Sequence, residues 1–404
     1  MSGRGIRGTD PGLEHRSISA RRVPHRIAIA FFLRLGLVAV IGADQVAAAP
    51  PEVARWQAVY DRTFVEHRAL FDQMAEGGNV DANYYTFQYV LDATLCTFEA
   101  TGDVAYLERA LSWEETIVSK ATILDRDGCR NWPASWKSPY ADQPISYQLW
   151  DFQGTTELSR TARIVLRDPG LRQRYGPRAT KILEFARNDI VDKHVDYRKG
   201  RDGFLGDADD RTRCINDKTV LLLTIVGDVA QVHADPKYAL FARGLAAGLR
   251  NRFTRLGDGL IWDQGKKGGD HLPWDTAHAN RIPRAVVDLH EAGIVFTRDD
   301  VQGLARLWTR TIWDGSVDDP RFANFIDGTN DKYKGRGPWG NGLVYSGWVA
   351  LGRHDEESRR CAEAVLQAIL SGKRNPSLDY NASAFGALEL AGHLSLMAAR
   401  SQKE

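Results

Sequence analysis

The segment FEATGDVAYLERA, from Phe98 to Ala110, contains a pattern that recurs along most of this 404-residue chain. A helical stretch stops before Gly102, and Asp103 directly after it is suited to cap a following helix. The two helices are therefore joined by a three-residue corner, which is typical of an α-helical hairpin. On both sides of this corner, apolar residues recur at helical spacing almost throughout, and strand-like alternation is rare and short.

The pattern predicts twelve helices with connections that alternate in length. The links after even-numbered helices are short, whereas those after the third, fifth, seventh and ninth are long and rich in Gly, Pro, Asp and Trp. If the helices run alternately up and down, every long link lies on one face, at the N-terminal ends of the even-numbered helices. We expect helices at 52–75, 83–100, 104–120, 145–166, 175–192, 215–232, 235–255, 274–292, 297–313, 341–351, 355–372 and 381–399.

The even-numbered and odd-numbered helices differ in composition. Tyr89–Leu95, Val220–Val229 and Ala384–Leu394 are small or apolar with little charge, whereas odd-numbered helices carry many charges. A helix that is apolar all round is buried, and one with a polar side is peripheral. We therefore expect six inner and six outer helices. This pattern alone does not exclude an open α-solenoid.

Six helical hairpins with their long loops on one face resemble the (α/α)6-toroid enzymes, which include six-hairpin glycosidases, polysaccharide lyases and epimerases. The resemblance covers Glu52 to Ala399. It is carried by the hairpin corners, such as GNGLVYSGWVALGRHD at Gly340–Asp355, and by WDTAHAN at Trp274–Asn280. It implies an all-α (α/α)6 toroid with inner and outer helix rings, acting on carbohydrate, and it transfers no catalytic residue.

The N-terminus has the pattern of a secretory signal. Three arginines precede an apolar run over 27–43, and Ala47-Ala48-Ala49 follows it. Arg34 interrupts the run, which argues against a stable membrane span after signal cleavage, although an uncleaved anchor stays open. We predict that residues 1–49 are an N-terminal extension and signal peptide, that residues 50–404 are the toroid catalytic domain, and that the protein is secreted or periplasmic.

The charge and the cysteine pattern indicate which partners, cofactors and disulfides to expect. The formal net charge of +1 gives no reason to expect a nucleic-acid partner. No CxxC or HExxH spacing occurs, so no metal or cofactor is expected. Among the four cysteines, Cys129 and Cys214 both fall in long loops on the same expected face, and we predict that these two can form a disulfide.

The start of the eighth helix is the strongest single motif. Asp275 occupies a position suited to an N-cap, and His278 follows three residues later on the same helical face. A carboxylate and an imidazole at the mouth of an apolar helix indicate acid–base chemistry. The alternative interpretation is a plain cap with a surface histidine.

Five of the six even-numbered helix starts place an aromatic residue next to a polar one. Aromatic faces stack on sugar rings, and amides and carboxylates bind hydroxyl groups, so this repetition predicts a glycan-binding cleft. The alternative is that these residues are caps and core. The predicted substrate-binding residues are Tyr84, Tyr85, Gln88, Tyr147, Trp150, Trp274, Arg336, Trp339, Asn341, Tyr380 and Asn381.

Glycoside hydrolysis is the function that this pattern favours, with a polysaccharide or oligosaccharide as substrate. It needs two carboxyl groups, and Asp275 is the first candidate. Asp151, Asp217 and Glu157 compete for the second place. In some mannan-active enzymes of the toroid class that this chain resembles, adjacent aspartates serve as catalytic pairs. Here both pairs, 209–210 and 318–319, are flanked by charge or turn residues and are interpreted as turns or caps.

Two alternatives remain open. A polysaccharide lyase or uronate epimerase would use His278, Tyr345 or Tyr333 as base or acid. It would hold the substrate carboxylate with Asn280, Asn341, Arg281 or Arg336. A non-enzymatic, glycan-binding helical-repeat protein is the other alternative, and it should lack a cluster of perturbed acids in the cleft.

Overall fold

A computed structural model describes residues 49–77, 81–124, 128–135, 148–195, 217–262, 273–330 and 342–402, without the side chains of 194 and 195. The chain from Ala49 onward forms one compact unit. The predicted N-terminal extension and signal peptide, apart from Ala49, lie outside the described residues. Within the described part of the chain, no helix has the length and apolar character needed to cross a bilayer.

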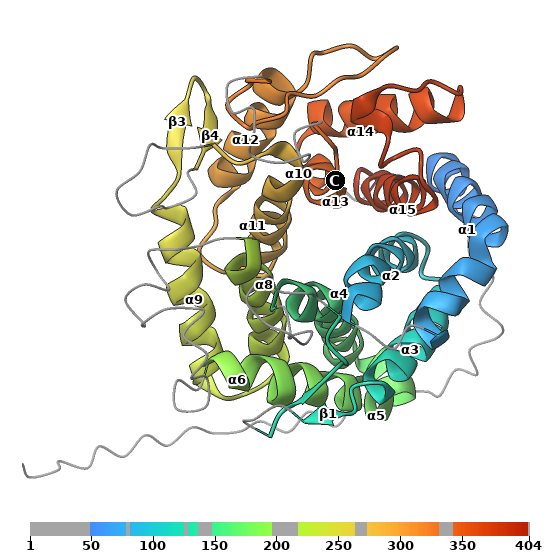
Figure 1. Ribbon diagram of the computed structural model, residues 1–404, viewed down its shortest axis with the longest axis vertical. Helices are drawn as coiled ribbons and strands as arrows, with labels where there is room; N and C mark the ends of the chain where they lie inside the picture. The colour runs from blue at the N-terminus through green and yellow to red at the C-terminus, as the bar shows by residue number, and fades with distance from the viewer. Residues whose placement is uncertain are drawn as a thin grey trace, which may run out of the picture. The chain divides into compact units, whose positions relative to one another are not determined.

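The inner helices form a closed ring, which confirms the predicted all-α (α/α)6 toroid. Each inner helix packs against the next one in chain order, and the last packs against the first (Figure 1). The closure of α15 onto α2 excludes an open solenoid. The inner ring consists of α2 (Asp81–Thr101), α4 (Gln148–Arg167), α8 (Asp217–Val232), α11 (Arg281–Glu291), α13 (Ser346–Val349) with η3 (Ala350–Arg353), and α15 (Ala384–Arg400).

The outer helices cover the inner ring, each next to the inner helix that it accompanies in the chain (Figure 1). The outer ring consists of α1 (Pro51–Gly77), α3 (Val104–Ser119), α5 (Pro169–Phe185) continuing through η1 (Ala186–Val191) into α6 (Asp192–Val195), α9 (Pro236–Arg250), α12 (Arg298–Leu307) with η2 (Trp308–Ile312), and α14 (Glu356–Leu370). The remaining elements are α10 (Thr276–Ala279), η4 (Pro376–Leu378), β1 (Ile123–Leu124), β2 (Arg130–Asn131), β3 (Thr254–Leu256) and β4 (Gly259–Ile261).

The corner between α2 and α3 has the geometry that its residues predict. Gly102 adopts a φ of 69°, in the left-handed region that glycine enters at little cost. The Asp103 carboxylate then accepts a hydrogen bond of 2.9 Å from the Ala105 N–H and caps α3. A chain reversal of this kind brings each outer helix back beside its inner neighbour.

Several helix boundaries differ from the prediction by a few residues, and two of these differences have a clear local cause. α5 begins at Pro169 instead of Tyr175, because Asp168 accepts a hydrogen bond from Leu171 and a proline fits the first helical turn. α9 ends at Arg250, and the antiparallel hairpin β3–β4 replaces the expected last turn. Neither change alters the order of inner and outer helices.

Candidate functional site

The start of α10 is fixed by pairing with a distant loop. Asp275 bridges Phe325, and the Thr276 N–H donates to the Asn324 carbonyl at 2.9 Å. The Thr276 hydroxyl donates to the Ala323 carbonyl at 2.6 Å. This pairing holds the chain extended up to Asp275, so the helix begins at Thr276 with Asp275 as its N-cap.

Asp275 and His278 form a close pair, as their spacing predicted. The Asp275 carboxylate accepts a hydrogen bond of 2.9 Å from the His278 N–H, which is the capping contact. Both carboxylate oxygens also lie 2.9 Å from Nδ1 of His278. The imidazole therefore carries a proton on Nδ1 toward the carboxylate, and the carboxylate fixes the ring orientation. The side chains of Asp275 and His278 are 17% and 30% exposed, so both remain accessible from the loop face.

Arg281 lies one turn further along and is clamped by residues of other inner helices. Its Nε and Nη2 donate to Oε1 of Gln153 at 3.0 and 2.8 Å, and Nη2 also donates to the Tyr85 hydroxyl at 3.0 Å. Its Nη1 lies 3.8 Å from Oδ2 of Asp217, the first residue of α8. Burial opposes the charge, but the two neighbouring tyrosines and Asp217 raise the pKa of Arg281 further above its usual range. One guanidinium thus links four inner-ring segments.

Three tyrosines form the adjoining wall. The rings of Tyr345 and Tyr380 have centroids 4.0 Å apart, and each lies 5.7 Å from the ring of Tyr89. The Tyr380 hydroxyl donates to Oε2 of Glu389 at 2.7 Å. Burial first, and then neighbouring negative charges that include Asp275, raise the pKa of Tyr345 to about 12, so this phenol is neutral at physiological pH.

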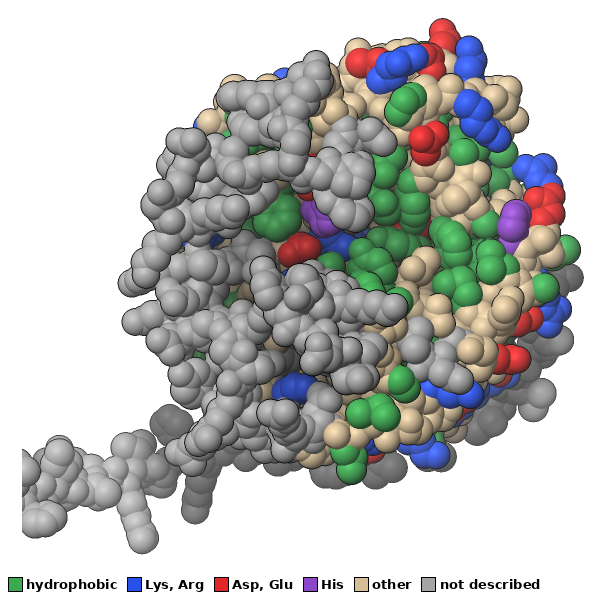
Figure 2. All heavy atoms as spheres, in the orientation of Figure 1, with side chains coloured by type: hydrophobic (Ala, Val, Ile, Leu, Met, Phe, Trp, Pro, Cys, Tyr) green, Lys and Arg blue, Asp and Glu red, His purple; other side chains and the backbone are tan. Residues whose placement is uncertain are grey.

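These residues meet at the N-terminal ends of the inner helices, as the alternating link lengths predicted. Figure 2 shows this face: between the atoms drawn grey, an acidic, a histidine and a basic side chain are visible in a recess. We call the eight side chains that meet here the candidate site. They come from α2, α4, α8, α10 and its N-cap, α11, and the segments before α13 and α15. They are Tyr85, Gln153, Asp217, Asp275, His278, Arg281, Tyr345 and Tyr380.

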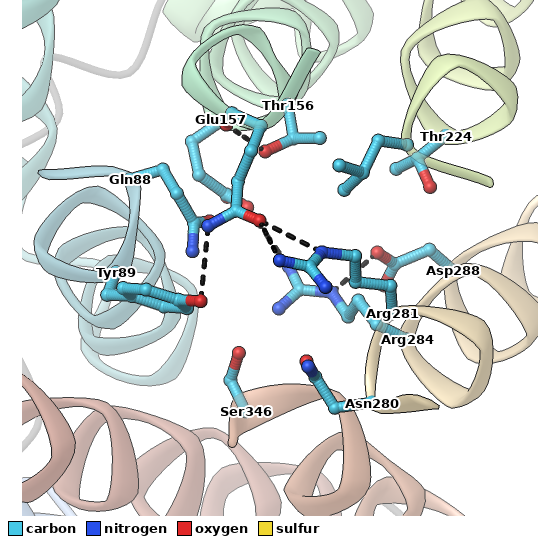
Figure 3. Close-up of a pocket in the computed structure, with 12 residues that line it drawn as sticks. Gln88, Tyr89, Thr156, Glu157, Thr224, Asn280, Arg281, Arg284, Asp288 and Ser346 are labelled. Carbon is cyan, nitrogen blue, oxygen red and sulfur yellow. Dashed lines mark hydrogen bonds and ion pairs between the residues drawn. The ribbon is translucent and has the colours of Figure 1, made fainter. Parts of the chain in front are cut away.

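A polar cavity of about 40 Å³ lies deeper on the ring axis. Figure 3 shows its lining residues pointing from several inner helices toward a common space. Arg281 and Gln153 belong to both the cavity wall and the candidate site, and Glu157, Arg284 and Asp288 line the deeper part. The volume suits a few water molecules, not a sugar ring.

Below the cavity, Asp92 is the hub of a buried ion-pair network. Its oxygens lie 2.7 Å from Arg160, 2.7 Å from Arg284 and 2.9 Å from Nε2 of His393. Burial works against the Asp92 charge, but the two guanidinium groups and the imidazole hold its pKa well below its usual range. The network joins α2, α4, α11 and α15 across the ring.

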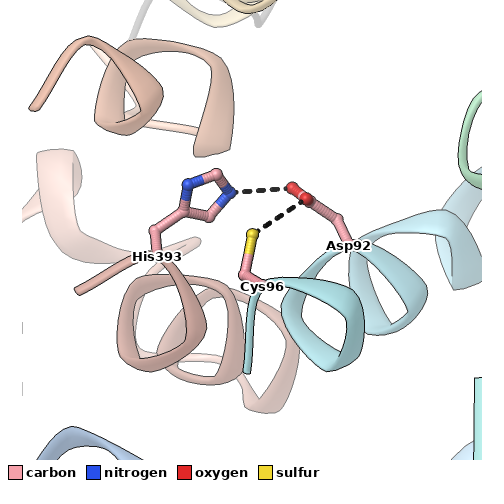
Figure 4. A group of neighbouring side chains, drawn as sticks. All are labelled: Asp92, Cys96 and His393. Atoms are coloured by element: carbon pink, nitrogen blue, oxygen red, sulfur yellow. Dashed lines mark hydrogen bonds and ion pairs between the residues drawn. The ribbon is translucent and has the colours of Figure 1, made fainter. Parts of the chain in front are cut away.

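The group Asp92, Cys96 and His393 offers three potential metal ligands within 4.8 Å of one another (Figure 4). However, a cation placed there would face two arginines already hydrogen-bonded to Asp92, and Arg160 also contacts the Cys96 sulfur at 3.4 Å. Burial raises the pKa of the Cys96 thiol to about 12, which opposes thiolate ligation. We therefore interpret this group as a structural network.

Several predicted residues lie elsewhere. Asp151 is buried and its Oδ2 accepts from Asn131 at 3.1 Å, on the side of α4 away from Gln153. Tyr84 packs its buried ring 5.1 Å from Trp132. Trp274 and Asn381 are buried, and Asn381 donates to the Val344 carbonyl at 3.0 Å.

Two predicted residues lie closer to the candidate site. Gln88 lines the cavity, and the ring centroid of Trp150 lies 6.2 Å from that of Tyr85. Tyr147, Tyr333, Arg336, Trp339 and Asn341 lie outside the described residues.

Sequence reasoning missed the acid Glu389, whereas it named Glu157 as a candidate for the second carboxylate. Glu389 was hidden in an apolar helix, although a single glutamate among alanines and leucines is itself a signal of a buried functional or paired acid. Burial, followed by the charge of Asp92, raises its pKa to about 8. Glu157 lines the cavity, and burial raises its pKa to about 7 despite two nearby arginines.

The remaining sequence predictions concern cysteines and paired aspartates. Cys214 lies outside the described residues, so the predicted disulfide with Cys129 stays a prediction. Asp319 sits in an exposed turn, where its carboxylate accepts from Asn375 at 2.7 Å and pairs with Arg321. That placement agrees with the interpretation of Asp318-Asp319 as a turn.

No family model matches this chain, and no curated protein matches it in sequence. Among solved structures, the GH76A alpha-1,6-mannanase from Salegentibacter sp. HEL1_6 is 14% identical over 86% of this chain and 100% of that chain, with a TM-score of 0.47. An inactive variant of the same enzyme with two aspartates replaced, in complex with alpha-1,6-mannotetrose, is also 14% identical over 86% of this chain and 99% of that one, with a TM-score of 0.46. The toroidal fold itself follows from the closed inner ring of this chain.

Proposed function

We propose that this protein hydrolyses glycosidic bonds of a polysaccharide or oligosaccharide. The observation that carries the proposal is the Asp275 carboxylate, oriented by His278 and adjacent to partly exposed tyrosine faces at the open end of the inner ring. Tyrosine faces bind the apolar side of a sugar ring, and an oriented carboxylate can activate a water molecule. Both features are supplied by helix starts that converge on one place.

Asp275 takes the proton of the attacking water in this proposal. The Asp275 carboxylate accepts the His278 backbone N–H and also faces the His278 imidazole, and these contacts hold it in a fixed orientation. Among the described residues, Asp217 is a further carboxylate of the loop face, 14% exposed and 3.8 Å from Arg281. Its position suits binding of a substrate hydroxyl group together with the guanidinium. Asp151 is not retained as a candidate, because its carboxylate is turned toward Asn131.

A polysaccharide lyase or uronate epimerase is the second candidate function. It is favoured by three functional groups that lie close together. The His278 imidazole on α10 lies one helical turn from the Arg281 guanidinium on α11, and the Tyr345 phenol is nearby. The His278 imidazole could remove the proton next to a carboxylate, the neutral Tyr345 phenol could donate a proton, and the Arg281 guanidinium could neutralise the carboxylate. This reaction needs a uronic acid in the substrate, whereas hydrolysis does not.

A glycan panel separates these functions. The protein is incubated with neutral and uronic-acid polysaccharides, and new reducing ends and ultraviolet absorbance of an unsaturated product are measured in parallel. Hydrolysis gives reducing ends without absorbance, and a lyase gives both. Binding without either product would contradict hydrolysis and lyase cleavage. Exchange of the uronate proton next to the carboxylate with solvent deuterium, measured by NMR, would then separate an epimerase, which cleaves no bond, from a non-enzymatic glycan-binding protein.

The Asp275→Asn variant tests the residue assignment. Asparagine caps a helix about as well as aspartate, so the variant should fold normally and lose about a hundredfold or more in kcat. Asp168→Asn is the matched control, because Asp168 is also an N-cap but lies on the outer helix α5. If Asp275→Asn keeps the turnover of the control, Asp275 is only a cap.

Secretion is a separate part of the proposal, and it rests on the signal-like residues 1–49. Expression of the full chain in a host with a secretory pathway, followed by N-terminal sequencing of the exported protein, should give a mature chain that begins close to Pro50. A full-length N-terminus in the membrane fraction would instead indicate an anchor.

A further inference from the structure

Glu389 is a buried acid next to the candidate site, and the hydrolysis proposed above gives it no role. It lies in the second turn of α15 and is 2% exposed. Its Oε2 accepts the hydrogen bond from Tyr380, whose ring is in contact with Tyr345 at the edge of the site. A single phenolic hydroxyl therefore separates a buried carboxyl group from the place where a sugar would bind.

The groups around Glu389 explain why it holds a proton. Asp92 and Tyr89 face it from α2, Tyr345 and Ser346 face it from the start of α13, and His393 lies one turn along α15. Burial and the Asp92 charge raise its pKa to about 8, and the hydrogen bonds from Tyr380 and Ser346 and the charge of His393 offset this rise only in part. Glu389 is consequently protonated at neutral pH, as a general acid must be.

We propose that Glu389 is the proton source for the reaction and that it delivers the proton through the Tyr380 hydroxyl to the leaving glycosidic oxygen. This inference rests on the proposed hydrolase function. It assigns the acid of the reaction to a buried pair instead of to a carboxylate of the loop face. Tyr380 is then the catalytic residue that touches the substrate, and Glu389 acts through it.

The proton and electron balance of this step is complete. For the transfer, the Tyr380 hydroxyl turns its hydrogen from Oε2 of Glu389 to the leaving oxygen, and the protonated Glu389 then donates to the Tyr380 oxygen. The Tyr380 O–H bond breaks as the leaving oxygen gains the proton, and the Tyr380 oxygen takes the proton of Glu389. The glycosidic C–O bond breaks with its electron pair on the leaving oxygen, water attacks the anomeric carbon, and the water proton passes to Asp275. Return of one proton from Asp275 to Glu389 through solvent restores the starting state.

Leaving-group chemistry tests the assignment. A sugar bound to an alcohol needs an acid for departure, whereas a dinitrophenyl glycoside of the same sugar does not, because dinitrophenolate leaves unprotonated. Tyr380→Phe and Glu389→Gln should each lower kcat on the natural glycan by about a hundredfold or more, the usual scale of general acid catalysis. Both variants should stay within about threefold of wild type on the dinitrophenyl glycoside.

Tyr106→Phe is the matched control, because Tyr106 also donates to a carboxylate, Asp61 at 2.8 Å, but on the outer helices α3 and α1. It should leave kcat on both substrates unchanged. An equal loss on both substrates in Tyr380→Phe and Glu389→Gln would mean that the pair only supports the structure, and no loss on the glycan would also overturn the proposal.

A second readout needs no turnover. Ionisation of Glu389 places a charge 2.7 Å from the Tyr380 hydroxyl, so tyrosine difference absorbance should titrate with a midpoint near pH 8. This midpoint should disappear in Glu389→Gln, and its absence from wild type overturns the inference even if glycan is hydrolysed. If the midpoint is present but no glycosidic bond is cleaved, the hydrolase proposal fails and the delivery step fails with it, while the coupling of the pair stands.

Discussion

Replacing Asp92 with asparagine should destabilise the toroid by about 3 kcal/mol or more. The Asp92 side chain is 1% exposed, and its two oxygens neutralise Arg160 and Arg284 at 2.7 Å each. Removal of one partner of a buried ion pair costs about 3–5 kcal/mol, because the other charge remains buried. Arg160 retains Glu157 at 3.0 Å, and Arg284 retains Asp288 at 2.6 Å, so the expected cost falls at the lower end of that range.

Urea denaturation followed by far-ultraviolet circular dichroism measures this cost directly. Asp258→Asn is the control: Asp258 pairs with Arg310 on the surface, where the two side chains are 52% and 56% exposed. The control should change the free energy of unfolding by less than about 1 kcal/mol. If Asp92→Asn loses no more free energy of unfolding than the control, the buried ion-pair network around Asp92 does not hold the inner ring together.

Three further predictions address packing, pH and the site. Gly392→Ala should lower the free energy of unfolding by about 1–3 kcal/mol in urea denaturation, because the new Cβ would lie 2.5 Å from the Ala93 carbonyl oxygen. Gly244→Ala is the control: it has open space around it and should raise the free energy of unfolding by about 0.5–1 kcal/mol. Glu157 binds its proton more tightly in the folded chain, with a pKa of about 7 against 4.5, so its stabilising contribution is full below pH 4.5 and is lost as pH rises through 7. Unfolding free energies across this range should therefore fall more steeply in wild type than in Glu157→Gln, and parallel curves would contradict the shift. Arg281→Lys cannot reproduce the forked contacts of the guanidinium and should lower kcat/KM on the order of 10–100-fold, while an unchanged value would exclude a positioning role.

The ring could be predicted because its signals are local and repeated. Corners such as Gly102-Asp103 combine a left-handed glycine with a capping aspartate, and each one specifies a chain reversal independently of the rest. Boundaries were less predictable where two local signals compete. At Asp168-Pro169-Gly170 the same residues can end one helix or start the next, and the structure shows both.

The candidate site could be predicted only where one helix start carries the chemistry. Asp275 and His278 are neighbours in the sequence, so their contact followed from helical spacing. Asp151 was expected in the cleft, but it and Gln153 lie on different sides of α4, and periodicity alone does not say which side faces the axis. The partnership of Glu389 with Tyr380 depends on ring closure and pKa shifts that no local pattern encodes.

The closure of α15 onto α2 has a consequence for biosynthesis. Asp92 on α2 and His393 on α15 are 301 positions apart in the chain. The contact between them can therefore form only after nearly the whole toroid has been translated. Such long-range contacts form slowly, and the face of α2 that α15 covers lacks its partner until the end of synthesis. Completion of the inner ring therefore depends on the last helix of the chain, and a chain interrupted before α15 would leave this buried ion-pair network incomplete.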